Sequence, residues 1–87
     1  MTSSDAESRL TDLVSTYRRM VRAVIAKVGG RTLADRRDDV EQQVWLIIWR
    51  RLRGEQEIDH PTSYLYTVAR HEAMRAVQDE LLRAERQ

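Results

Sequence analysis

The sequence contains no cysteine, only one proline and only three glycines. The absence of cysteine excludes disulfide bonds and thiolate metal sites. The scarcity of glycine and proline favours long helices over sheets, because sheets need frequent turns. The longest apolar run, 44–49, is far too short to cross a bilayer, and the acidic, polar start "MTSSDAESRL" does not have the pattern of a signal peptide. We therefore expect a cytoplasmic protein that does not insert into membranes.

The residue patterns of common enzyme sites are also missing. The sequence has no glycine-rich phosphate loop and no HExxH pattern. The two histidines, His60 and His71, have no third metal ligand at a useful spacing. Ser63 and His71 lie eight residues apart on one predicted helix, a rise of about 12 Å, so they do not form a nucleophile and base pair. The sequence predicts a non-enzyme with no metal and no cofactor.

The composition that remains is typical of one small helical domain, which we expect to span residues 1–87. The chain has 41% hydrophobic and 33% charged residues, with a net charge of +1. Fourteen of its fifteen basic residues are arginine, the side chain suited to bidentate contacts with phosphate and carboxylate. The near-neutral net charge does not by itself indicate a nucleic-acid-binding protein.

Two breaks, at 29–32 and 54–61, divide the chain into three predicted helices. The first begins near Ser4, which forms a capping box with Glu7, and ends at Gly29 or Gly30. Its apolar residues recur at helical spacing and form one stripe: Leu10, Leu13, Val14, Tyr17, Val21, Val24, Ile25 and Val28. The opposite face carries Arg18, Arg19 and Arg22.

The second helix is expected to start between Thr32 and Asp35 and to end near Gly54. The paired Arg36 and Arg37 run against the trend of acids at its start. The third helix begins at Pro61, because proline is tolerated at the first helical position, with Asp59 or His60 as its cap. Three helices with short connections predict a small all-α bundle of three, or with one more element four, helices.

On a helical wheel the second helix has two different faces. The core face carries Val40, Val44, Ile47 and Ile48, and the second face carries Asp39, Gln42, Gln43, Leu46, Arg50 and Arg53. Trp45 and Trp49 lie on a flank between the two faces. One interpretation is a solvated face with a single exposed leucine. The other is a partner-binding face, with a polar rim around an apolar spot.

The same stretch, "DDVEQQVWLIIWRRL", resembles the core-binding helix of region 2 in bacterial sigma-70-family sigma factors, closest to the extracytoplasmic-function group. Acids, a glutamine and tryptophans stand at the family's spacing, although Gln43 replaces the usual glutamate. The segment "TSYLYTVARHEAM" is similar to the start of the family's third helix, with Tyr64 in place of tryptophan and His71 in place of asparagine.

This resemblance implies a function and a set of site residues. The implied partner of the second helix is the clamp-helix coiled coil of the RNA polymerase β′ subunit, bound by Asp39, Gln42, Gln43, Leu46 and Arg50. The implied partner of the third helix is the non-template strand of the promoter's minus-ten element, bound by Ser63, Tyr64, Thr67, His71 and Arg75. The loop 55–63 is implied to hold a flipped base, and an anti-sigma factor is a further candidate partner.

The third helix also has two expected faces. The outer stripe carries Tyr64, Thr67, His71, Arg75, Gln78 and Leu82, which can stack on and bond to unpaired bases. The other interpretation is an ordinary solvated face preceded by a flexible loop. The inner side carries Leu65, Ala69, Ala73 and Ala76, together with Tyr66 and Val77.

The end of the chain leaves alternatives open. The tail "QDELLRAERQ" is neutral to acidic, so phosphate attraction there is weak. The alternative function is therefore a sigma-like module that binds polymerase or an anti-sigma factor without reading DNA, and a third interpretation is an unrelated helical bundle. A region 4 domain, which ordinary family members carry, is not expected within these 87 residues.

Overall fold

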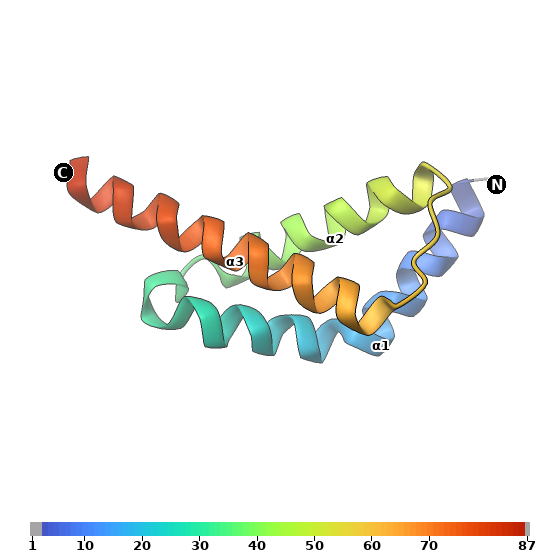
Figure 1. Cartoon of the computed structure of the whole chain (residues 1–87), viewed down its shortest axis with the longest axis horizontal. Coiled ribbons are helices and arrows are strands. Elements are labelled where there is room, and N and C mark those ends of the chain that lie inside the picture. The colour runs from blue at the N-terminus through green and yellow to red at the C-terminus, as the bar shows by residue number, and fades with distance from the viewer. Residues whose placement is uncertain (1–2, 87) are drawn as a thin grey trace.

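The computed structural model describes residues 3–86, with side chains from residue 5 onward, as three α-helices around a short 3₁₀ turn (Figure 1). The elements are α1 (Ser3–Gly29), η1 (Gly30–Leu33), α2 (Arg37–Arg53) and α3 (Pro61–Arg86). The all-α prediction is therefore confirmed, with three α-helices and a four-residue 3₁₀ turn in place of a fourth. The predicted capping by Ser4 falls outside the described side chains.

Helices α2 and α3 both pack against α1. Val21, Val24 and Ile25 of its predicted stripe are buried, and the other members of the stripe are half-buried against two core clusters. One cluster joins α1, η1 and α2 to the later half of α3, and the other joins the opposite ends of α1 and α2 to the start of α3. Within residues 3–86, no helix combines the length and apolar character needed to cross a membrane.

Both glycines at the end of α1 are required, for different reasons. A Cβ on Gly29 would lie 2.6 to 2.7 Å from side-chain atoms of Leu33, which is completely buried. Gly30 has a φ of +50°, in the left-handed region that glycine adopts without strain. The close approach at Gly29 and the turn at Gly30 together reverse the chain within a few residues.

Helix α2 begins at Arg37, so the prediction of a start between Thr32 and Asp35 was wrong. The residues before it form η1 and a turn instead. The two arginines that run against the helix dipole have tertiary partners that explain them. Arg36 Nη1 donates to Glu80 Oε1 of α3 at 2.7 Å, and Arg37 Nη2 donates to the Gly30 carbonyl at 3.1 Å.

Helix α2 ends near Gly54, as predicted, but the left-handed residue is the one after it. Glu55 has a φ of 59°, whereas Gly54 has a φ of −81°. Glu55 N–H donates to the Leu52 carbonyl at 3.1 Å and Gln56 N–H to the Arg51 carbonyl at 3.2 Å. This pair of bonds is a Schellman motif, which usually has glycine where Glu55 stands.

Helix α3 starts at Pro61, as predicted. The His60 carbonyl accepts the Tyr64 N–H at 3.0 Å, so His60 rather than Asp59 occupies the N-cap position. Figure 1 shows α3 starting next to α1 and extending past the turn between α1 and α2.

The inner residues of α3 are largely those expected. Leu65, Ala69, Ala73 and Ala76 are buried, whereas Val77 is only half-buried against the core. Tyr66, however, is 49% exposed, so its inward placement was wrong. The buried row is narrow because small alanines bring α3 close to its neighbours, which leaves the adjacent Tyr66 outside. On α2, Ile47 is likewise only half-buried, in contrast to Val40, Val44 and Ile48.

Candidate functional site

The residues predicted to bind a protein partner gather on one side of α2. Their spacing of three, four and seven residues places them in neighbouring turns. Four are exposed and Leu46 is half-buried among them. We call this surface the α2 face: Asp39, Gln42, Gln43, Leu46 and Arg50.

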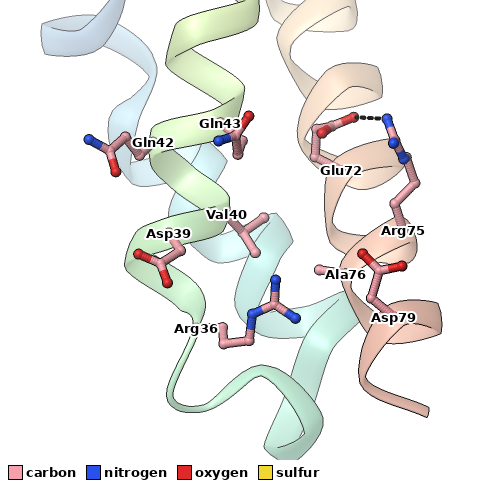
Figure 2. A pocket seen from close by; sticks show the side chains of 9 residues that line it. All are labelled: Arg36, Asp39, Val40, Gln42, Gln43, Glu72, Arg75, Ala76 and Asp79. Carbon is pink, nitrogen blue, oxygen red and sulfur yellow. Dashed lines mark ion pairs between the residues drawn. The ribbon is translucent and has the colours of Figure 1, made fainter. Parts of the chain in front are cut away.

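A hollow of about 430 Å³ lies between α2 and α3 on one flank of this face (Figure 2). Asp39, Val40, Gln42 and Gln43 all line it from α2, and Figure 2 shows Val40 and Gln43 on the side of α2 that is nearer to α3. The α3 wall includes Arg75 and Glu72, whose charged groups lie 3.7 Å apart. We call this space the α2–α3 hollow.

A second hollow, of about 460 Å³, lies on the other flank of the α2 face. Gln42, Asp39 and Trp45 of α2 line it together with Arg18 of α1. We call this space the α1–α2 hollow. The α2 face therefore consists of polar residues around the apolar Leu46, with a hollow on each side. Such a surface suits a protein partner.

A buried acid below the α1–α2 hollow is the main feature that the sequence analysis missed. Glu41 is 6% exposed. It accepts hydrogen bonds from Arg18 Nε at 3.0 Å, Arg22 Nη1 at 2.7 Å and Trp45 Nε1 at 2.9 Å. The two arginines come from α1, so these bonds fix the position of α2 on α1. The available sequence signal was an acid inside the apolar face of the wheel, opposite arginines on the first helix.

The environment of Glu41 favours its charged form. Burial alone raises the pKa of a carboxyl group, but the hydrogen bonds from Trp45, Arg22 and Arg18 outweigh burial and hold the pKa of Glu41 below its usual range. The same contact with Glu41, helped by Asp38 at 3.4 Å, raises the pKa of Arg22. The Glu41 carboxylate is therefore ionised at neutral pH, and its role is to hold α2 in place on α1.

The residues predicted to bind nucleic acid divide between two further hollows, along α3 and the loop before it, and one of them, Arg75, also lines the α2–α3 hollow. Ser63, Tyr64 and Thr67 line a space of about 360 Å³ together with the loop residues Ile58 to His60. Thr67, His71 and Arg75 line a space of about 520 Å³ along α3. We call these the loop hollow and the α3 hollow. Thr67 belongs to both, so the five predicted residues form a continuous surface in which Tyr64 alone is half-buried.

A second residue that the sequence analysis missed braces the loop hollow. The guanidinium of Arg51, near the end of α2, lies 4.5 Å from the centre of the Tyr64 ring. Arg51 Nη2 also donates to the Glu57 carbonyl at 3.0 Å, while its buried Nε has no hydrogen-bond partner among the described residues. One side chain thus connects the end of α2 to the loop and to the aromatic wall of the hollow.

The outer surface of α3 is more apolar than the sequence analysis predicted. The large apolar residues that are well exposed within the described range all lie on α3: Tyr66, Met74, Leu81 and Leu82. Tyr66 and Met74 border the α3 hollow beside Arg70. Exposed aromatic and sulfur-containing side chains next to arginines can stack on bases while the arginines contact phosphates.

One comparison with known proteins identifies a family. The family model described as Sigma-70 region 2 matches residues 13–83. This range contains all of η1 and α2 and most of α1 and α3, with every residue of the α2 face, the loop hollow and the α3 hollow. No curated protein and no solved structure matches the chain.

Proposed function

The chain belongs to the sigma-70 region 2 family, and from this premise we propose that it binds the RNA polymerase core through the α2 face and the promoter minus-ten element through α3. The family consists of non-enzymatic transcription-factor domains with a role in RNA polymerase binding and promoter recognition. We further propose that the chain belongs to the extracytoplasmic-function group and works in the cytoplasm, where RNA polymerase is.

The observation that carries the proposal is the chemistry of the α2 face. The side chain of Asp39 makes no hydrogen bond or ion pair with any described residue, and the amides of Gln42 and Gln43 are exposed around Leu46. Unpaired acceptors around an apolar centre suit an arginine-rich helical partner. The clamp helices of the β′ subunit, which the family resemblance implies, are such a partner.

The loop hollow and the α3 hollow support the second half of the proposal. Tyr64 forms an aromatic wall beside a space of about 360 Å³, and enzymes that flip bases stack them between aromatic or apolar side chains. His71 and Arg75 continue the surface along the α3 hollow. We propose that the non-template strand follows this path, with one base in the loop hollow.

Binding to RNA polymerase core tests the first half. We expect Asp39→Ala and Gln42→Ala each to weaken binding by about 1 kcal/mol or more, and to leave the unfolding midpoint unchanged because both side chains are exposed. Glu85→Ala, on the exposed last turns of α3, is the matched control and should leave affinity unaltered. Equal affinity for all three variants would exclude the α2 face as the interface.

Binding to a single-stranded minus-ten oligonucleotide, with and without polymerase core, tests the second half. We expect Tyr64→Ala and His71→Ala to reduce retention of the strand by about 1 to 2 kcal/mol, with core affinity retained. Because Tyr64 is half-buried, His71→Ala is the variant that separates a lost contact from a lost fold.

A second candidate function is favoured by the charge of the later part of α3. Asp79, Glu80 and Glu85 there offset Arg83 and Arg86, and Glu80 Oε1 already pairs with Arg36 and Arg83. Such a segment attracts phosphate only weakly. If core binds the domain tightly but no promoter strand is retained, the domain acts as a protein-binding module for polymerase or an anti-sigma factor.

A further inference from the structure

Three arginines form a basic surface on α1 that the proposed function does not use. Arg18, Arg19 and Arg22 are all exposed. Together with Ser15 and Asp38 they line a hollow of about 750 Å³. We call the three residues the α1 arginine patch. Arg18 also borders the α1–α2 hollow, so the patch adjoins the α2 face directly.

The buried Glu41 holds two of these side chains in position. Arg18 contacts Glu41 through its Nε, and Arg22 contacts both Glu41 and, at 3.4 Å, Asp38 through its Nη1. The Arg18 side chain remains 59% exposed and the Arg22 side chain 49% exposed. A guanidinium has five N–H donors in a planar fork. Several donors of each arginine are therefore available outward, in a fixed geometry.

Arg19 stands beside this fixed pair and makes no ion pair or hydrogen bond with the described residues. It has no structural task that the fold reveals. Three guanidinium groups, two of them held in position, form a binding site for an anion. Carboxylates and phosphates both bind guanidinium groups in this way.

The neighbouring charges favour carboxylates of a protein over the phosphates of a nucleic acid. Asp38 borders both the patch and the α1–α2 hollow, and Asp39 lies just beyond it. A nucleic-acid strand carries a negative charge at every nucleotide, so a strand that runs from the patch toward the α2 face brings its phosphates close to these two acids. A protein surface can instead change sign from one residue to the next.

We propose that the polymerase-binding surface continues from the α2 face across the α1–α2 hollow onto the α1 arginine patch. The partner then carries basic side chains opposite Asp39 and carboxylates opposite Arg19. This proposal rests on the proposed function for the identity of the partner. Two adjacent regions of opposite sign also fix the orientation of the partner, because the reversed orientation places like charges together.

Charge reversal at Arg19 tests the proposal, because this side chain has no internal contact to lose. We expect Arg19→Glu to weaken binding to RNA polymerase core about 10-fold and Arg19→Ala about 3-fold. Both losses of affinity should be larger at low salt than at high salt, because salt screens the charges. The control is Lys27→Glu, which makes the same change of charge on an exposed residue of α1. Lys27 lies two turns, about 12 Å along the helix axis, from Arg19. We therefore expect Lys27→Glu to change the affinity for polymerase core less than about 2-fold.

The outcomes separate this proposal from the proposed function. If Asp39→Ala weakens core binding and Arg19→Glu does not, the extension onto α1 is wrong and the function of the α2 face stands. If neither variant changes affinity, both proposals fail. If Arg19→Glu weakens binding of the minus-ten oligonucleotide without core, the patch serves phosphates and the proposal is overturned. Urea unfolding of each variant shows whether the fold is retained, and Arg19→Gln replaces any variant that unfolds.

Discussion

The side of the domain where α1 meets α2 and the side where α2 meets α3 are built differently. On the first, a buried carboxylate receives three hydrogen bonds, two of them from the other helix, and a glycine lies against the buried Leu33. On the second, the helices leave a polar hollow between them, and the contacts across it and to the loop involve partly exposed side chains.

This difference corresponds to the two kinds of partner that we propose. A protein surface binds best to groups held in advance, because less conformational entropy is lost on association. The α1–α2 hollow, on one flank of the α2 face, lies on the anchored side. A single strand with unstacked bases needs side chains that adjust to it, and Tyr64, His71 and Arg75 lie on the less anchored side. The comparison predicts that changes on the first side affect stability more than changes on the second.

The largest expected effect follows from removing the buried anchor. Glu41→Ala leaves the indole N–H of Trp45 without its acceptor and two arginines without their shared partner. We expect the free energy of unfolding to fall by about 3 kcal/mol, measured by urea denaturation. The exposed Glu85→Ala should change it by less than about 0.5 kcal/mol. A loss from Glu41→Ala below about 1 kcal/mol would contradict the view that buried polar contacts hold this side.

A somewhat smaller effect is expected in the turn between α1 and α2. The Cβ of Gly29→Ala would lie 2.6 Å from a side-chain carbon of Leu33, and moving this buried residue should cost about 2 kcal/mol of unfolding free energy. At Gly30 a Cβ meets nothing within 4 Å, so only the φ of +50° opposes Gly30→Ala, at about 1 kcal/mol. Thermal unfolding of the two variants compares the cost of the close contact at Gly29 with the cost of backbone strain at Gly30. Equal losses of stability would show that Leu33 moves aside at little cost.

On the other side, Arg51→Ala should affect stability less than it affects binding. Its contacts with the Tyr64 ring and the Glu57 carbonyl are partly exposed, so we expect a loss of about 1 kcal/mol in unfolding free energy. Retention of the minus-ten oligonucleotide should fall further, because the wall of the loop hollow loses its support, while core affinity is unchanged. Arg51→Lys keeps the charge but not the planar fork and should recover only part of the retention. Full recovery would mean that charge alone matters.

The smallest predicted effect is a dependence of stability on pH. The folded-state pKa of Glu41 is lowered by hydrogen bonds that outweigh burial, so the unfolded chain binds a proton more readily. The stabilisation from Glu41 is therefore fully present above the ordinary glutamate pKa of about 4.3 and is lost as pH falls through the lower folded value. Unfolding free energies of the native chain and Glu41→Gln, compared between neutral and acidic pH, should converge toward acid. A constant difference would show that Glu41 does not titrate in this range.

The features that were predictable from the sequence are those that local periodicity determines. Leu65, Ala69, Ala73 and Ala76 repeat at helical spacing, so their burial does not depend on which helix they meet. Pro61 marks the start of α3 through its own backbone constraint. The α2 face also follows from spacing alone, because its members share one side of any helix.

The features that were not predictable depend on which helices face each other. The wheel places Glu41 beside the core face of α2, but the sequence does not show what pairs with it until α1 supplies Arg18 and Arg22. Arg51 gains its role only when the chain returns along α3 with Tyr64. The start of α2 depends on such contacts too, because Arg36 is held by Glu80 of α3 and Arg37, the first residue of α2, by the Gly30 carbonyl of η1.

Both tryptophans of the chain lie on α2, and this placement provides an optical reporter. The indole of Trp45 is bonded to Glu41 and borders the α1–α2 hollow, whereas the indole of Trp49 lies 5.9 Å from the guanidinium carbon of Arg53. Intrinsic fluorescence of the domain therefore originates from the helix that carries the proposed polymerase-binding face. Substitution of either indole by phenylalanine leaves a single tryptophan, which can be excited selectively over the three tyrosines, so events around Trp45 and Trp49 can be followed separately in unlabelled protein.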